Sequence, residues 1–441
     1  MEHQENKELE SIIAEFSQLE GKQAVPDKEN ARTAPKAEEH AEAAEPEAIE
    51  RKLLLREKVQ IQVRKATRKK QSVVLLSLIA AVLMALAIVL PNILPDFATS
   101  TYAKRKDNEV VVMNFVGDIM LGRNIEKIAE QKGYDALYAG VKPYWDDADL
   151  VFANLESAVL KDDVSNYQEA DKNIHLYCGY EALKAASDAG INMWACANNH
   201  AFDYMGKAIT ELCDYFESNS MTYAGIGRNI GEAANYVITE VNGYKIAFLS
   251  ISQVYYAEAL ATETGAGMFA TLYNGYNEVV YEASQNADIT IVYMHWGDEN
   301  LPTITEKQIR TAHRLVDAGA DIIIGSHPHV LQSAELYRGS VILYSMGNFI
   351  FDQGNTFSRD TMMARFVIKE SGSTSMELIP MRTVDGIPYE TSSIFYVNRI
   401  NHVLTKNLKE SKYKLDKDNH VVITTAKMPL PEAEITEENG Q

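Results

Sequence analysis

Five short polar fragments, each at the end of a hydrophobic run, constrain the fold of this chain more than any other feature. They are Gly117-Asp118, Asn154-Leu155-Glu156, Asn198-Asn199-His200, His295-Trp296-Gly297 and His327-Pro328-His329. In open α/β sheets, ligands bind just beyond the carboxyl ends of the strands. Each fragment also carries residue types that bind divalent cations. We therefore expect an α/β fold in which the five fragments meet at one binding site.

The pattern between these fragments supports the same fold class. Apolar runs predict strands at 110–115, 149–153, 193–197, 244–251, 289–294 and 321–324, and helical spacing predicts helices at 180–189, 205–218 and 306–318. Alternating helices and buried strands are typical of α/β proteins. After Leu336 only strand patterns follow, at 341–344, 363–368 and 375–380. We expect antiparallel strands there, and no further helix.

The chain changes character twice before the globular pattern begins. Residues 1–50 are acidic and almost lack aromatic side chains, which predicts a disordered tail. Residues 51–71 carry nine lysines and arginines against the single acid Glu57. Residues 72–90 have no charge, and the apolar character resumes to residue 94, so we expect a transmembrane helix at 72–94. A buried helix of a soluble domain fits less well because such helices rarely lack charged residues for so long, and a cleaved signal fits less well because about 70 residues precede the run.

The charges also predict orientation and partners. The basic residues before the span place the N-terminus in the cytoplasm by the positive-inside rule, with weak opposition from residues 104–106. We therefore expect a single-pass protein of the cell membrane, with a linker at 95–109, an extracytoplasmic domain at 110–400 and a C-terminal extension at 401–441 that is loose from about Met428. The net charge of −20 argues against nucleic acid as a partner.

The three cysteines do not form a recognisable metal or disulfide pattern. Cys178, Cys196 and Cys213 are an odd number for an exported domain, and their spacing matches neither a zinc knuckle nor a disulfide scaffold. We expect them to be small buried hydrophobic residues. A disulfide between Cys196 and Cys213 remains open at this level.

Three candidate metal ligands each have an ordinary alternative. Asp118 follows a predicted strand, where an aspartate is often a helix N-cap. Glu156 ends another strand and could be a solvated loop acid, but a carboxylate at the end of an apolar strand is costly to bury without a positive partner. His295 alone could be a hydrogen-bonded core residue. Their occurrence together favours a shared metal site.

The pair His327 and His329 is the most specific local signal. An extended Pro328 between them can direct both imidazoles to one side. Imidazole and carboxylate together suit Zn, Mn, Fe or Ni, and the sequence does not select among these metals. We expect one or two divalent ions.

The fragment Asn198-Asn199-His200 can serve both binding and proton transfer. One amide oxygen can bind a metal, although asparagine also starts turns. His200 is then left as a proton donor, and Asp203 is close enough in sequence to orient it through its other ring nitrogen.

These residues together resemble a known family. Gly117–Arg123, Asn154–Glu156, Asn198–Asp203, His295–Glu299, His327–His329 and Met346–Phe349 are similar to the motifs of CapA (PgsA-type) capsule-synthesis proteins, over about residues 110–355. That family is associated with poly-γ-glutamate production at the cell surface. It is in turn similar to calcineurin-like metallophosphoesterases, which implies a four-layer αββα sandwich with two metals at the sheet ends.

The resemblance also implies a role for each residue. Asp118 and His329 would hold one metal, Asn199, His295 and His327 the other, and Glu156 would stand at the bridging position. His200 would be the general acid, and Arg123, Glu299 and Asn348 would line the substrate side. Two positions depart from the phosphoesterase pattern: Met120 replaces a histidine ligand, and Glu156 replaces an aspartate.

From the resemblance we expect a membrane-anchored, extracytoplasmic protein with a metal-dependent, hydrolase-like site. It would act in the synthesis, export or processing of an anionic surface polymer, with membrane subunits of a polymer synthase as further partners. A general surface metallophosphoesterase is one alternative. The other is a non-enzymatic polymer-binding subunit of a synthase complex, which the departure at Met120 favours.

Overall fold

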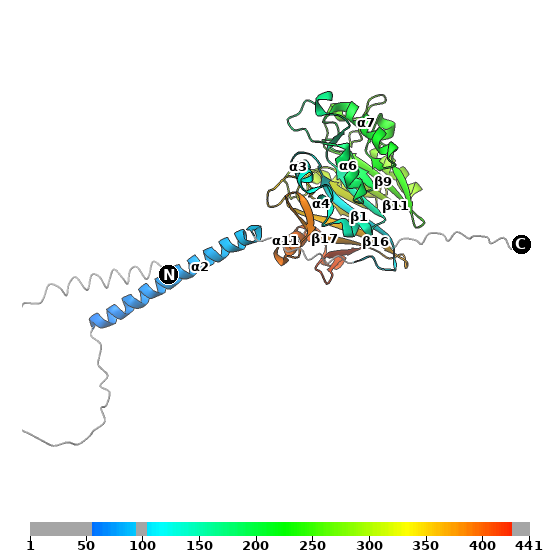
Figure 1. Ribbon diagram of the computed structural model, residues 1–441. Helices are drawn as coiled ribbons and strands as arrows, with labels where there is room; N and C mark the ends of the chain where they lie inside the picture. Colours follow the sequence, from blue (N-terminus) through cyan, green and yellow to red (C-terminus); the bar gives the residue numbers. More distant parts are fainter. Residues whose placement is uncertain (1–54, 94–103, 426–441) are drawn as a thin grey trace, which may run out of the picture. The chain divides into compact units, whose positions relative to one another are not determined.

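The structure is a computed structural model that describes residues 55–93 and 104–425 (Figure 1). The chain divides into two units, residues 1–86 and 87–441. The predicted tail at 1–50, most of the predicted linker and the end of the chain from Met428 lie outside the described residues.

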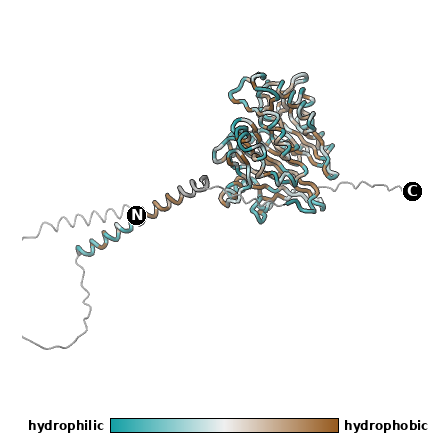
Figure 2. The backbone as a smooth tube through the Cα atoms, in the orientation of Figure 1, coloured by the Kyte–Doolittle hydropathy of each residue, from teal (hydrophilic) through white to brown (hydrophobic). Residues whose placement is uncertain are grey.

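The segment that carries the uncharged run is helical. Helix α2 spans Leu55–Ile93, and its large apolar side chains between Val73 and Met84 are exposed. Figure 2 shows this helix hydrophilic over its first half and hydrophobic further along. Among the described residues, no helix has both the length and the apolar character required to cross a membrane.

The larger sheet contains the first of the predicted strands. Its described strands run in the order β19-β20-β17-β16-β1-β2-β5-β6. They are β1 (Glu109–Ile119), β2 (Leu150–Leu155), β5 (Met193–Ala195), β6 (Thr222–Ala224), β16 (Asp360–Lys369), β17 (Thr374–Val384), β19 (Tyr413–Leu415) and β20 (Val421–Thr424). Strands β1, β2, β5 and β6 are parallel, β16 pairs antiparallel with β1, and β17 pairs antiparallel with β16. Two short strands pair with interior strands of this sheet, β15 (Asn348–Ile350) with β1 and β18 (Ile387–Glu390) with β17.

The smaller sheet follows the order β13-β14-β12-β11-β9-β8. Its strands are β8 (Val237–Val241), β9 (Tyr244–Ser252), β11 (Ile289–His295), β12 (Ile322–Ser326), β13 (Ala334–Tyr337) and β14 (Ser340–Leu343). The four central strands are parallel, and β8 and β13 are antiparallel edge strands. Two further pairs lie outside both sheets: β3 (Ala158–Leu160) with β4 (Tyr177–Gly179), and β7 (Ile226–Gly227) with β10 (Gly267–Met268).

The two sheets face each other across an aromatic core. The Phe115 and Phe152 rings stack at 4.9 Å between centroids, and Phe152 meets Phe248 of the smaller sheet edge-on at 5.2 Å. Alternate residues of the same strands face outward and bury the apolar sides of the helices. The order is therefore helix, sheet, sheet, helix, and the expected α/β class is confirmed.

Helices on the outer face of the larger sheet are α3 (Arg123–Lys132), α4 (Asp135–Tyr138), α5 (Lys142–Asp146), α6 (Tyr180–Asp188) and α7 (Met205–Ser218). Those on the outer face of the smaller sheet are α8 (Ile230–Ala233), α9 (Tyr276–Asn286) and α10 (Glu306–Asp317). Helix α10 begins with a capping box, in which Thr305 and Gln308 bond each other's backbone N–H groups. The three cysteines are buried and free, so no Cys196–Cys213 disulfide is present.

The expectation that no helix follows Leu336 is wrong. Helix α11 spans Ile394–Thr405 and packs Ile400 and Leu404 into the core between the sheets (Figure 1). Strands β19 and β20 then pair with the larger sheet through β17. The folded domain therefore continues beyond residue 400, where the sequence analysis placed a boundary.

A buried histidine fastens this C-terminal segment to the sheet. His420 lies directly before β20, with Nδ1 2.8 Å from Glu377 Oε1 and Nε2 3.1 Å from Glu390 Oε1. Burial alone lowers the pKa of His420, but the hydrogen bonds to Glu377 and Glu390 outweigh it and raise the pKa to about 10. The histidine is therefore a cation that joins two carboxylates.

This ion pairing predicts a specific loss of stability at alkaline pH. Because the pKa is raised from about 6.5 in the unfolded chain, the stabilisation is complete below pH 6.5 and disappears as the pH rises through 10. The wild-type domain should lose free energy of unfolding between pH 6.5 and 10 relative to His420→Gln. Chemical denaturation of both proteins across this range is the measurement. Parallel curves would contradict the assignment.

Candidate metal centre

Two buried carboxylates form the centre of the site. Asp118 lies near the end of β1, and Glu156 directly follows β2. Both side chains are fully buried. The glycine before Asp118 is required by a close backbone approach, since a Cβ on Gly117 would lie 2.0 Å from the Gly347 carbonyl oxygen. Asp118 is not a helix cap, because Gly122 occupies the N-cap position of α3.

Three histidines from the smaller sheet surround these carboxylates. His295 ends β11, and His327 and His329 follow β12. His295 Nε2 lies 3.8 Å and His329 Nε2 3.6 Å from Glu156 Oε1. Two overlapping groups, Glu156 with His327 and His329, and Asp118 with Glu156 and His295, have ligand atoms within 4.8 Å of one another. Side chains at the carboxyl ends of β1 and β2 of the larger sheet and of β11 and β12 of the smaller sheet therefore form one cluster.

Asn199 joins the same cluster from the loop after β5. Its Oδ1 lies 2.6 Å from His295 Nε2. Both atoms are potential metal donors. All six sequence-predicted ligands are therefore brought together, although they come from five separate segments between Asp118 and His329.

Strand register supplies the groups that orient these ligands. Asp118 is paired with Asn154 of β2 on one side and with Asn348 of β15 on the other. Asn154 Nδ2 donates to Asp118 Oδ1 at 2.9 Å, and Asn348 Oδ1 lies 2.8 Å from His329 Nδ1. A hydrogen bond at Nδ1 fixes the tautomer in which Nε2 can bind a metal.

The same principle applies in the smaller sheet. Ser326 is the register partner of His295, and its Oγ lies 3.0 Å from His295 Nδ1. Asn198 donates to Asn154 Oδ1 at 3.2 Å and accepts from the His200 backbone N–H at 3.1 Å. The orienting roles of Asn154, Asn198 and Ser326 were not predicted from the sequence. Asn154 could have been found, because it lies two residues before Glu156 and an extended strand gives both the same face.

His200 and Asp203 form a separate hydrogen-bonded pair beside the cluster. His200 Nδ1 lies 2.7 Å from Asp203 Oδ2, so Nε2 is the nitrogen left for proton exchange. Lys172 Nζ donates to Asp203 Oδ1 at 2.6 Å and to the Asn199 carbonyl at 2.8 Å. Burial lowers the pKa of His200 despite the neighbouring Asp203. No sequence pattern marked Lys172, which lies in an irregular loop.

The electrostatics of the cluster fit a divalent cation. Burial raises the pKa of Asp118, and burial with the Asp118 charge raises the pKa of Glu156 well above its usual range. Burial with the neighbouring His327 lowers the pKa of His295 far below its usual range, and burial with His329 lowers the pKa of His327 to about 3. The neutral imidazoles are in the protonation state that metal binding requires, and a bound cation would offset the burial that disfavours the charged form of the two carboxylates.

Two unpaired buried atoms support the same conclusion. Glu156 Oε1 and His327 Nδ1 have no hydrogen-bond partner among the described residues. Native proteins rarely leave buried polar atoms unsatisfied. The residues present therefore fit a divalent cation.

The backbone at the histidine pair is strained. His327 has φ of +92° and His329 of +57°, the left-handed region that residues other than glycine seldom adopt. The prediction of an extended segment is therefore wrong, and two left-handed residues direct both rings to the cluster. Such strain costs about 1–3 kcal/mol per residue and is concentrated at functional sites.

The remaining predicted residues lie around the cluster rather than in it. Arg123 is exposed, with Nη2 3.0 Å from Asp352 Oδ1, and Glu299 is exposed in the loop after β11. Asn348 is buried behind His329, so it orients a ligand and does not form an open surface. Met120 is buried, and its sulfur accepts from the Gly122 N–H at 3.2 Å.

Comparison with known proteins gives the family. The chain is 35% identical to "Capsule biosynthesis protein CapA" of Bacillus anthracis, over 85% of this chain and 92% of that protein. It is 35% identical to "PGA biosynthesis protein CapA" of Bacillus subtilis, over 66% of this chain and 76% of that protein. Among solved structures, a Thermus sulfate thiohydrolase SoxB aligns with a TM-score of 0.34 at 12% identity, covering 63% of this chain and 58% of that one, too low a score to carry an argument. The family model "Bacterial capsule synthesis protein PGA_cap" matches residues 112–353, and the chain belongs to this family.

Proposed function

We propose that this protein is an accessory protein of poly-γ-glutamate capsule synthesis whose metal centre acts hydrolytically on the polymer. The observation that carries the proposal is the convergence of Asp118, Glu156 and three histidines at one buried point, with unpaired atoms on Glu156 and His327. The names of the Bacillus relatives support the polymer, since one is a capsule and the other a PGA biosynthesis protein.

The residues divide into ligands and proton carriers. Asp118, Glu156, Asn199, His295, His327 and His329 would hold one or two divalent ions. Such an ion, when bound, supplies Lewis acidity and lowers the pKa of bound water. His200, held at Nδ1 by Asp203, would protonate the leaving group from Nε2. Lys172 donates hydrogen bonds to Asp203 and to the Asn199 carbonyl. It thereby fixes the position of the His200–Asp203 pair relative to Asn199.

A non-enzymatic, polymer-binding subunit is the second candidate, and Met120 favours it. A thioether is a soft and poor ligand for a hard cation, and the Met120 sulfur already accepts a hydrogen bond from Gly122. A site with one well-formed metal position could bind the polymer without cleaving it. A general metallophosphoesterase remains the third reading, and hydrolysis of a phosphodiester would distinguish it.

The polymer function is tested in cells. A strain that produces its capsule only through this protein should lose most surface poly-γ-glutamate, or make polymer of altered length, when the protein carries His295→Ala. Polymer amount and chain length by gel electrophoresis are the readouts, with protein abundance followed by immunoblot. His313→Ala is the matched control, because His313 lies on helix α10 and pairs with Glu335 of β13, and neither residue belongs to the cluster. Unchanged polymer in the His295 variant would sink the proposal.

Although no helix of the described residues meets the length and hydropathy required for a span, we further propose that the uncharged segment at 72–94 anchors the protein in the cell membrane, with residues 1–71 inside and the domain outside. The support is the uncharged sequence at 72–90, the basic residues before it and the exposed apolar side chains between Val73 and Met84. Synthase subunits in the same membrane would be its partners.

This topology predicts opposite protease sensitivity at the two ends. Proteinase K added to intact spheroplasts should remove a C-terminal epitope tag and spare an N-terminal one, because only the C-terminal side is then outside the membrane. Permeabilised spheroplasts should lose both tags. Loss of the N-terminal tag alone from intact spheroplasts would reverse the proposed orientation.

A further inference from the structure

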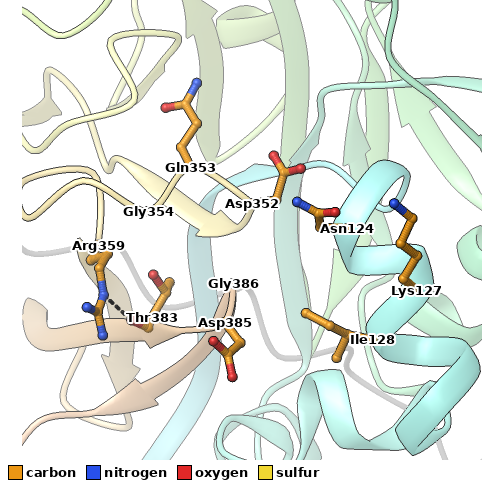
Figure 3. A pocket seen from close by; sticks show the side chains of 10 residues that line it. All are labelled: Asn124, Lys127, Ile128, Asp352, Gln353, Gly354, Arg359, Thr383, Asp385 and Gly386. Carbon is orange, nitrogen blue, oxygen red and sulfur yellow. Dashed lines mark hydrogen bonds between the residues drawn. The ribbon is translucent and has the colours of Figure 1, made fainter.

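A cavity of about 500 Å³ lies beside the metal centre. It is enclosed by the start of α3, by the segment between β15 and β16, and by the turn between β17 and β18 (Figure 3). The residues that carry its chemistry are Asn124, Lys127, Asp352, Gln353, Arg359 and Asp385.

The cavity is linked to the metal centre by hydrogen bonds. Gln353 Oε1 accepts from Asn348 Nδ2 at 3.1 Å, and the other end of the Asn348 amide lies 2.8 Å from His329 Nδ1. One side chain therefore separates the cavity wall from a candidate metal ligand. A molecule held in the cavity would place its next unit near the centre.

Two cations in the cavity lack an acidic partner among the described residues. Figure 3 shows Lys127 and Arg359 on opposite sides of the cavity. Arg359 donates from Nε to the Thr383 carbonyl at 3.0 Å, which fixes the guanidinium and leaves its two terminal nitrogens for a ligand. A guanidinium held in this way is suited to bidentate binding of a carboxylate.

A buried acid in the same cavity lacks a hydrogen-bond donor. The Asp352 side chain is only 3% exposed, and neither oxygen accepts a hydrogen bond within the described part of the chain. Arg123 Nη2 lies 3.0 Å from Oδ1, so the charge is partly compensated, but the geometry is not that of a hydrogen bond. Asp385 adds a second acid at the β17–β18 turn. A donor supplied by a ligand would satisfy Asp352.

We propose that this cavity binds the free amino end of a γ-glutamyl chain. The unit at that end carries an ammonium and a carboxylate on one carbon, which matches a buried acceptor between two unpaired cations. Asp352, helped by Asp385, receives the ammonium, and Arg359 and Lys127 receive the α-carboxylates of the first units. This inference rests on the proposed polymer function and deepens it, because it makes the site selective for chain ends.

The test is calorimetric binding of short γ-linked glutamate oligomers to the full-length protein in detergent, with metal removed by chelation. The wild type should bind an oligomer with a free amino end at least about tenfold more tightly than its N-acetylated form, since acetylation removes the charge that Asp352 receives. Arg359→Gln should weaken binding by a similar factor. Lys245→Gln is the control and should leave the affinity unchanged. Lys245 is an exposed cation at the start of β9, whereas the metal centre lies at the carboxyl ends of the parallel strands.

Each contrary result overturns the inference. Equal affinity for the free and acetylated oligomers removes selectivity for the amino end, and this comparison requires no protein variant that must fold. An unchanged affinity of Arg359→Gln, or no binding to the wild type, removes the cavity as the site. These failures differ from failure of the proposed function, which is judged by polymer production in the His295→Ala strain.

Discussion

Alanine at position 295 should remove the bound metal, whereas alanine at position 200 should leave the metal in place and abolish most turnover. His295 Nε2 lies beside both Glu156 and Asn199, so its loss removes a ligand from the middle of the cluster. His200 makes its side-chain hydrogen bond to Asp203 and belongs to neither group of possible ligands at the cluster. Loss of a proton donor typically reduces turnover about 10²–10⁴-fold.

Elemental analysis of the purified proteins, together with hydrolysis of poly-γ-glutamate and of a phosphodiester, provides the measurement. His313→Ala should match the wild type in both assays, because its partner Glu335 lies outside the cluster. Loss of metal from the His200 variant would show that His200 is itself a ligand. A wild type that holds metal but cleaves neither substrate would leave the polymer-binding candidate.

The position of the site was predictable because the strands are buried on both faces. Continuous apolar runs such as 289–294 could be identified, and the first polar residue after each run marked the strand end. The convergence of Asp118 with His329 needs two sheets to pack face to face with the carboxyl ends of their parallel strands on the same side. That arrangement came from the resemblance and not from the pattern.

The interior of the site was less predictable, for two physical reasons. The orienting partners depend on strand register, and sequence does not give register: Asn154 and Asn348 flank Asp118 only because β2 and β15 pair with β1 as they do. The left-handed backbone at His327 and His329 opposes local preference and is imposed by the surrounding structure. Lys172 comes from a loop without any periodic signal.

Helix α11 was missed because its sequence resembles a strand. Ile394–Thr405 contains isoleucine, valine, tyrosine and phenylalanine, which favour strands. Val397, Ile400 and Leu404 are nevertheless spaced by three and four residues and are all buried. Tertiary packing against the core between the sheets therefore outweighs local propensity, which is small for each residue.

Asp360→Ala should be among the most destabilising single substitutions in the domain, by about 3–5 kcal/mol. Asp360 begins β16, and its Oδ1 accepts from Nε of Arg382, its register partner on β17, at 3.0 Å. Arg399 of α11 donates to both carboxylate oxygens, at 2.6 and 2.7 Å. One acid thus joins two strands and a helix.

The cost is large because the alanine variant removes the acid that balances a buried charge. The Arg382 side chain is 2% exposed and its guanidinium lies 3.5 Å from the centre of the Tyr396 ring, so water cannot replace the carboxylate. Asp317→Ala is the matched control: it breaks an exposed pair with Arg338, and exposed pairs contribute less than about 1 kcal/mol. Chemical denaturation of the three proteins gives the free energies of unfolding. Equal losses in the two variants would mean that the buried network does not hold α11 against the sheet.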